Sequence, residues 1–164
     1  MATASDLFKA VRAADLAGVR KAVEDGAPVE ARGGEEKFSP LMVAAMLGHL
    51  KIAEYLVAKG ASVDSRDSAN YTPLMQAAFR GRLDVARFLL DKGADINARS
   101  QTHWTPLMCA AAEGHTEIVK LLVSRGADRR GTNADGRTAA AIATMNGYSQ
   151  IADMLRDGAA RAGK

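Results

Sequence analysis

Cysteine, aromatic side chains and long apolar runs are all scarce in this sequence. Its 164 residues include a single cysteine, Cys109, and only four phenylalanines, three tyrosines and one tryptophan. One thiol excludes an internal disulfide framework and any metal site that needs several cysteines. No segment approaches the roughly 20 apolar residues that a transmembrane helix requires, and the first residues lack the apolar run of a signal peptide. We therefore expect a cytoplasmic protein that has no part in a membrane.

The net charge is also small, at +3 from 22 basic and 19 acidic residues. Such a weak excess gives no support by itself to the binding of nucleic acid. Hydrophobic residues make up 48% of the chain and charged residues 25%, which is the composition of a folded globular protein. The length is that of one ordinary domain.

A 33-residue repeat dominates the sequence. Pro40, Pro73 and Pro106 recur at that interval, each within a Ser/Thr-Pro-Leu-Met phrase. Two series of glycines keep the same period along the chain. The first series is Gly48, Gly81, Gly114 and Gly147, and the second is Gly60, Gly93 and Gly126.

One unit of the repeat predicts two short helices followed by an extended hairpin arm. Thr72 can accept a hydrogen bond from an amide of the first helical turn, and Pro73 suits the first helical position because it lacks an N–H. Gly81 is expected to end the first helix in the left-handed conformation, and Gly93 to close the second helix. Because such a helix pair cannot bury its own apolar surface, the units must stack on one another. Alanine pairs in the first helices allow this close approach.

Motifs that carry catalysis are absent, and the histidines and the cysteine fit the repeat as structural residues. The sequence has no glycine-rich phosphate loop, no His-x-x-x-His pair and no Cys-x-x-Cys motif. His49 and His115 follow the helix-ending glycine of their units, and His103 takes the hairpin position that Asn70 holds in another unit. Cys109 lies on a predicted first helix. We therefore expect no enzymatic activity, no catalytic residue, no cofactor, no metal and no small-molecule substrate.

The phrase Thr-Pro-Leu-Met-x-Ala resembles the Thr-Pro-Leu-His-x-Ala signature of the ankyrin-repeat family. The resemblance implies an all-α fold, an ankyrin-repeat α-solenoid of stacked helix-turn-helix units with β-hairpin loops. It covers nearly the whole of residues 1–164 as a single domain. The expected parts are an N-terminal capping repeat at 5–32, full repeats at 33–66, 67–99 and 100–132, a C-terminal capping repeat at 133–159, and a frayed tail at 160–164.

Three methionines depart from the family signature. Met42, Met75 and Met108 stand where the family has histidine, so the hydrogen bonds of that histidine between hairpins are expected to be absent. Their flexible thioether side chains should fill the space instead. One additional residue between Arg32 and Pro40 is expected to loosen the first hairpin.

The resemblance also implies a function as a protein–protein interaction module, an adaptor or scaffold that binds a partner protein on the concave face of hairpin tips and first helices. A stoichiometric inhibitor of a partner enzyme would use the same surface, so this alternative stays open. Binding of nucleic acid through an arginine edge is a weaker alternative, because the net charge is small and acidic residues lie nearby. The chain is expected to be monomeric.

Columns of equivalent residues provide the candidate contacts. Aromatic, arginine and methionine side chains are enriched at the centres of protein interfaces, and the columns at the hairpin tips and at the ends of the first helices are rich in them. The aromatic residues of the hairpin column either contact a partner or brace neighbouring hairpins, and both interpretations stay open. The candidate partner-binding residues are Phe38, Met46, Leu47, Arg66, Tyr71, Phe79, Arg80, Arg99, Trp104, Glu113, Arg137 and Met145.

Three arginines form a further column, which we call the arginine row: Arg32, Arg66 and Arg99. A positive edge made by these side chains would raise the association rate with a partner that has an acidic surface. Ordinary solvated surface charge explains the same column equally well.

Overall fold

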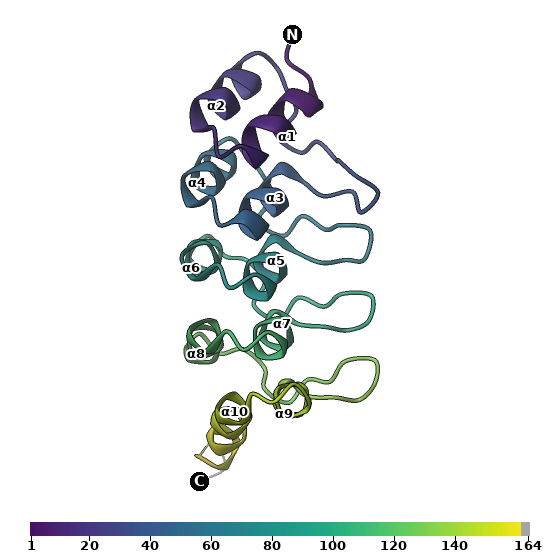
Figure 1. Ribbon diagram of the computed structural model, residues 1–164, viewed down its shortest axis with the longest axis vertical. Coiled ribbons are helices and arrows are strands. Elements are labelled where there is room, and N and C mark those ends of the chain that lie inside the picture. Colours follow the sequence, from purple (N-terminus) through teal and green to yellow (C-terminus); the bar gives the residue numbers. More distant parts are fainter. Residues whose placement is uncertain (162–164) are drawn as a thin grey trace.

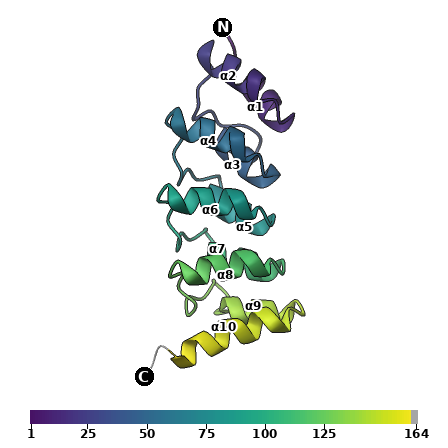
Figure 2. The same cartoon turned by 90° about the vertical axis from the view of Figure 1, so that its left-hand side faces the viewer.

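The part of the chain that the structure describes forms ten helices, which stack as five pairs along one axis (Figure 1). The computed structural model describes residues 1–161, with side chains to residue 156. The first helices of the pairs form one row and the second helices form another row beside it in Figure 1, and in the side view of Figure 2 the second helices face the viewer. The helices are α1 (Ala4–Arg12), α2 (Leu16–Glu24), α3 (Pro40–Leu47), α4 (Leu50–Ala58), α5 (Pro73–Phe79), α6 (Leu83–Asp91), α7 (Pro106–Ala112), α8 (Thr116–Ser124), α9 (Ala139–Met145) and α10 (Ser149–Arg161).

The sequence fixes the ends of the first helices in the same way from repeat to repeat. The Thr72 hydroxyl accepts a hydrogen bond from Met75 N at 3.3 Å, and Pro73 occupies the first turn of α5. The same hydroxyl cap begins the four other first helices, through Thr3, Ser39, Thr105 and Thr138. Gly81 follows α5 with a φ of +70°, so the prediction that this glycine adopts the left-handed conformation is confirmed.

One apolar core runs along the stack between the two helix rows. Leu74, Met75 and Leu89 of the central repeat have no exposed surface. Met42 and Met108 are equally buried, so the methionines that replace the family histidine fill the core as expected. The alanine pairs of the first helices are also fully buried, which lets these helices approach closely: Ala44, Ala45, Ala77, Ala78, Ala110 and Ala111.

The hairpin arms are held by hydrogen bonds but form no regular strands in the described part of the chain. Only isolated bridges occur there, one between Gly33 and Phe38 and one between Thr132 and Thr138. Backbone bonds nevertheless join successive hairpins, including the first hairpin with its additional residue. They are Ser68 N to Glu36 O at 2.8 Å, Gln101 N to Ala69 O at 3.0 Å and Ala134 N to Thr102 O at 3.0 Å.

His103 has the backbone conformation expected from its place in the repeat. Its φ is +61°, close to the +64° of Asn70 in the preceding hairpin. Glycine and asparagine enter this left-handed region at little steric cost, and histidine is tolerated there more readily than branched residues. The prediction that His103 substitutes for such a residue in a hairpin turn is therefore confirmed.

The C-terminal helix is longer than predicted. Helix α10 continues to Arg161, so residues 160 and 161 of the predicted frayed tail are helical. Residues 162–164 of that tail lie outside the described residues. Between residues 1 and 161, no helix has the length and apolarity needed to cross a membrane, and no group of three or more His, Cys, Asp or Glu side chains is arranged to hold a metal ion.

Candidate protein-binding surface

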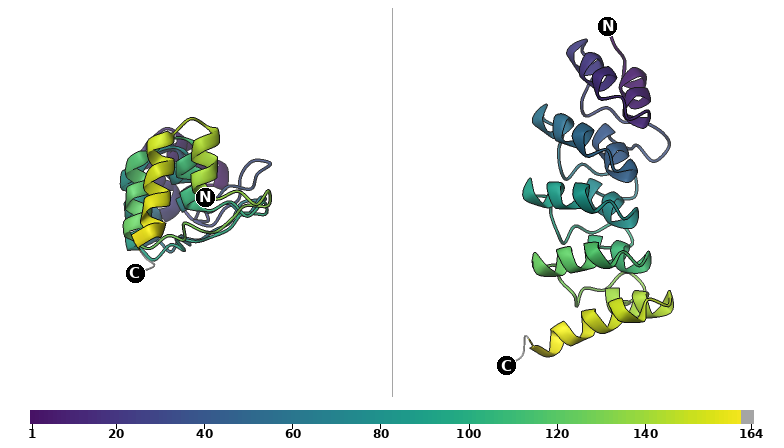
Figure 3. Two further views of the ribbon diagram at one scale, coloured as in Figure 1. Left: turned by 90° about the horizontal axis from the view of Figure 1, so that it is seen from below. Right: turned by 60° about the vertical axis from the view of Figure 1, so that its left-hand side comes forward.

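The hairpins and the first helices together form one long surface, which we call the inner face. Seen along the stack, the hairpins project from the helix rows like the second arm of an L (Figure 3). The second helices lie on the opposite side, which we call the outer face. Because successive repeats are nearly superimposed, residues that share a sequence column lie in a row along the stack.

Large apolar side chains are exposed where the first helices end. Leu47 is 40% exposed in the last turn of α3, Phe79 is 36% exposed at the end of α5, and Met145 is 60% exposed at the end of α9. We call these three residues the apolar row. Besides them, the described chain exposes only two other large apolar side chains, Met1 and Tyr148. These exposed apolar side chains lie at the ends of three first helices, in two neighbouring columns of the repeat, and the equivalent residue of α7, Ala112, is buried.

The aromatic residues of the hairpin column are less accessible than those of the apolar row. Phe38, Tyr71 and Trp104 are half-buried and pack against the core. Burial raises the pKa of the Tyr71 phenol, and hydrogen bonding with Ser100 of the next hairpin partly offsets the shift. These rings therefore pack against the core with one part of their surface, and their exposed edges remain for contact with a partner.

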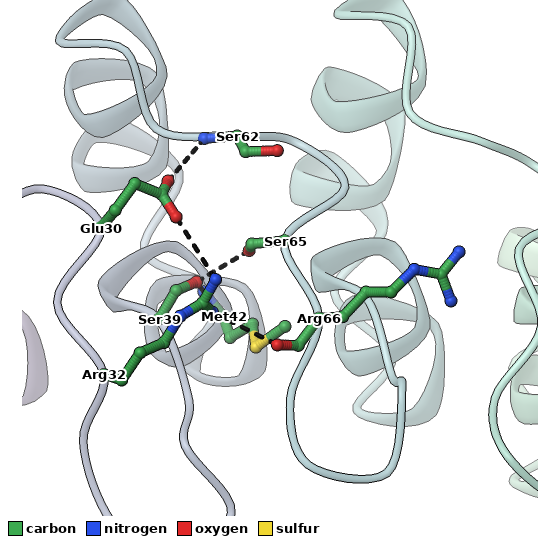
Figure 4. Close-up of polar contacts among 7 residues, drawn as sticks. All are labelled: Glu30, Arg32, Ser39, Met42, Ser62, Ser65 and Arg66. Carbon is green, nitrogen blue, oxygen red and sulfur yellow. Dashed lines mark hydrogen bonds and ion pairs between the residues drawn. The ribbon is translucent and has the colours of Figure 1, made fainter.

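Each member of the arginine row donates a hydrogen bond to the backbone of the next repeat. The acceptors lie one repeat further along the stack, and Figure 4 shows Arg32 and Arg66 at the first of these junctions. Part of each guanidinium is therefore used inside the molecule, although the three side chains remain exposed. The bonds are Arg32 to Arg66 O at 3.3 Å, Arg66 to Arg99 O at 3.0 Å and Arg99 to Thr132 O at 2.9 Å.

A second row of side chains links the repeats beside the arginine row. In each case a carboxylate or amide oxygen accepts from a backbone N–H in the arm of the following repeat, and Figure 4 includes the first example. The sequence column was not recognised because its members are chemically mixed. The bonds are Ser62 N to Glu30 at 2.7 Å, Asp95 N to Asp64 at 2.9 Å and Asp128 N to Asn97 at 2.9 Å.

Replacing Arg66 by alanine should therefore affect folding stability. We expect the free energy of unfolding to fall by about 0.5–1.5 kcal/mol, because the Arg99 carbonyl loses its guanidinium donor. Urea denaturation followed by circular dichroism measures this change. The matched control is Arg87→Ala on the outer face, where a change within about 0.5 kcal/mol is expected. Equal stability of the two variants would show that the arginine row is only solvated charge.

A third set of links covers the carbonyls at the ends of the first helices. Nε2 of His115 lies 3.0 Å from the Phe79 carbonyl oxygen, and because a carbonyl only accepts, this nitrogen carries the proton. The predicted structural role of His115 is thus confirmed. His49, at the equivalent position, buries its Nε2 without a partner in the described part of the chain. The three bonds are Arg82 to Met46 O at 3.0 Å, His115 to Phe79 O at 3.0 Å and Asn146 to Ala112 O at 2.8 Å.

Cys109 lies in the core of α7 and is unsuited to act as a nucleophile in the folded protein. It has no exposed surface, and burial raises the pKa of its thiol to about 12. The thiolate is therefore a negligible fraction near neutral pH.

We expect a disulfide reagent such as dithiobis-nitrobenzoate at pH 8 to label Cys109 only after denaturation. The rate of thionitrobenzoate release from native and from denatured protein measures this difference in labelling. Rapid labelling of the native protein would contradict the burial of this side chain.

The free energy of unfolding should also fall as pH rises from 9.0 towards about 12, because over this interval the unfolded thiol releases a proton that the folded thiol retains.

Two adjoining cavities lie at the N-terminal end of the stack. The first has a volume of about 340 Å³ and is lined by Arg12, Phe38, Val43, Met46 and Leu47. The second has a volume of about 640 Å³, lies between α1 and the first hairpin, and shares Arg12 with the first. The structure thus brings three of the predicted partner-binding residues, Phe38, Met46 and Leu47, together in the wall of the first cavity.

Sequence reasoning missed Arg12 and Val43, which complete the smaller cavity. Arg12 belongs to the capping repeat, whose sequence departs from the full repeats. The signal for Val43 was present in its column, where the other repeats have Gln76, Cys109 and Ile142.

The remaining candidates are distributed along the inner face. Arg80 and Glu113 directly follow α5 and α7 and are exposed, and Arg137 is exposed at the last hairpin. The Arg80 guanidinium lies 5.5 Å from the centre of the Phe79 ring. The structure therefore places a cation beside the central member of the apolar row.

Comparison with known families agrees with this geometry. A family model described as ankyrin repeats (3 copies) matches residues 7–100 and again residues 98–162. Among curated proteins, no match to the chain is found. Ankyrin repeats are in general protein–protein interaction modules. Because the two matches together span nearly the whole sequence, the chain belongs to the ankyrin-repeat family.

Proposed function

We propose that the chain is an adaptor or scaffold that holds a partner protein on its inner face. The observation that carries this proposal is the apolar row, in which Leu47, Phe79 and Met145 expose large side chains at the ends of three of the first helices. Exposed apolar side chains that cluster on one surface mark interaction sites more often than scattered ones do. Arg80 beside Phe79 adds a residue type that is enriched in interface hot spots.

The links between repeats support the same proposal. Hairpins and first helices are joined by backbone bonds, by the arginine row and by the caps on the first-helix carbonyls. A surface that is already ordered loses little conformational entropy when it binds, so affinity can come from a few apolar anchors. The arginines on which the nucleic-acid alternative depended donate to carbonyls of the chain itself, which favours a protein partner.

The experiment is an affinity capture from a lysate of the organism that carries the sequence, read by quantitative mass spectrometry. Wild type is compared with Leu47→Arg and Phe79→Arg on the inner face. Ala58→Arg, at an exposed position of α4 on the outer face, introduces the same charge as a matched control. Circular dichroism first confirms that all four proteins are folded.

We expect a partner that is retained by wild type and by Ala58→Arg and is reduced at least about tenfold with either inner-face variant, since removal of a hot spot costs about 2 kcal/mol or more. Calorimetric titration with that purified partner then measures the loss directly. Proteins captured equally by all four baits would contradict binding on the inner face.

A further inference from the structure

The N-terminal end of the inner face combines an apolar cavity with a group of basic side chains. The smaller cavity has walls from Phe38, Val43, Met46 and Leu47, and Arg12 stands at its edge. Its volume of about 340 Å³ is at the lower end of the range for small-ligand sites, which suits one bulky side chain rather than a whole cofactor.

The larger cavity continues from Arg12 towards the first hairpin. Lys9 and Arg32 also line it, with Phe8 at its apolar wall, and no Asp or Glu is among the described residues that line either cavity. Arg32 is partly occupied by Glu30 at 3.5 Å and by the Arg66 carbonyl. No such ion pair occupies Lys9 or Arg12 among the described side chains.

This local charge contrasts with the rest of the N-terminal repeat. A third cavity at the outer end of the stack is lined by both signs, with Lys9 and Lys21 facing Asp6, Asp15 and Asp25. The two cavities on the side of α1 that adjoins the inner face differ from it in that their described lining residues include no acid, although Lys9 also lies near Asp6. One carboxylate lies near the hairpin end of this region, because a Cβ atom at Gly34 would lie 3.4 Å from a carboxylate oxygen of Glu36.

The apolar lining is specific to the first full repeat. Val43 and Leu47 correspond to Gln76 and Arg80 in the second full repeat, and to Cys109 and Glu113 in the third. Repeats that otherwise keep nearly the same residues therefore differ at the positions that form the cavity. Leu47 remains 40% exposed, so the apolar lining opens to solvent.

From these observations we infer that the two cavities receive an acidic peptide segment of the partner, with one bulky apolar side chain in the smaller cavity and carboxylates beside Arg12 and Lys9. The apolar lining provides affinity for the anchor, and the cationic side chains give charge complementarity that accelerates association. The inference rests on the proposed function and adds the chemistry of the partner. It also moves the expected positive site from the arginine row to the end of α1.

The test begins with a library of random 15-residue peptides displayed on phage and selected on the wild-type protein. We expect enriched peptides to carry several Asp or Glu residues around one Leu, Ile, Met, Phe or Trp. One such peptide is then labelled with fluorescein and its affinity is measured by fluorescence anisotropy at low and high salt. The affinity should fall as salt rises, because the exposed charges are screened.

Three variants locate the site. Arg12→Glu and Leu47→Asp should each weaken the peptide at least about tenfold, whereas Arg87→Glu on the outer face should leave its affinity within about twofold. A peptide whose acidic residues are replaced by lysine should bind Arg12→Glu more tightly than wild type. Circular dichroism and thermal melts confirm that the variants are folded.

The outcomes separate the inference from the proposed function. Peptides that lose binding with Phe79→Arg but not with Arg12→Glu, or that lack acidic residues, overturn the inference and leave inner-face binding intact. A selection that yields no peptide sensitive to either change overturns the inference and counts against the proposed function as well. A labelled single-stranded oligonucleotide that binds through Arg12 more tightly than the peptide also overturns it.

Discussion

Replacing Leu89 by alanine is expected to lower the free energy of unfolding by about 2–5 kcal/mol. Leu89 lies in α6 of the central repeat and has no exposed surface, so its loss leaves a cavity at the level where the two halves of the stack meet. The melting temperature should fall by about 5–15 °C. Thermal and urea denaturation followed by circular dichroism measure both quantities.

The position of Leu89 adds a second expectation. In a repeat stack each unit contacts only its neighbours, so weakening the central unit reduces the coupling between the ends. We expect the urea transition of Leu89→Ala to broaden or to separate into two steps. The control is Leu90→Ala in the same helix, where the side chain is partly exposed and a cost of about 1 kcal/mol is expected. Equal costs at the two positions would contradict the described core.

Gly81→Ala is expected to destabilise the protein by about 2–4 kcal/mol. Gly81 has a φ of +70°, which alone disfavours a side chain. A Cβ atom at this position would also lie 2.6 Å from Cε1 of His115, whose ring is bonded to the Phe79 carbonyl. The added methyl group must therefore displace the ring and break that hydrogen bond. Urea denaturation provides the free energy.

Two controls separate the backbone contribution from the clash. Gly93 has a φ of +84° and would place a Cβ atom with nothing within 4 Å, so Gly93→Ala should cost only about 1–2 kcal/mol. In a His115→Ala background, Gly81→Ala should cost no more than Gly93→Ala. A cost that is unchanged in that background would show that the ring does not restrict Gly81.

The fold could be predicted from the sequence because nearly every contact of a repeat stack is made between copies of one pattern. Pro73 and Gly81 mark the ends of a first helix by local chemistry alone, and their equivalents do so again one repeat away. Once the repeat is recognised, stacking places the apolar residues of each copy against those of the next. The length of α10 was not predictable in this way, because the terminal repeat has no following copy to define its end.

The candidate surface could be predicted only in part. Leu47, Phe79 and Met145 are exposed in the positions that their columns indicated. The role of Arg66 was hidden because its acceptor is a backbone carbonyl, which has no signature in the sequence. Arg12 was missed for another reason, since its place beside the apolar cavity depends on how the capping helix packs on α3.

The arginine row also bears on how the length of this protein can change. Each arginine side chain donates a hydrogen bond to a backbone carbonyl of the following repeat, and the carbonyls of Arg66 and Arg99 accept from the arginine of the preceding repeat. The series of bonds from Arg32 to Thr132 therefore runs in one direction, and its geometry sets no fixed number of repeats. An in-frame duplication of residues 67–99 would supply one more arginine and one more carbonyl, and every existing bond would find an equivalent partner. Insertion of whole repeats thus requires no compensating substitution in the arginine row. Insertion of any other number of residues between two of these arginines would remove the equivalent spacing on which the hydrogen bonds depend.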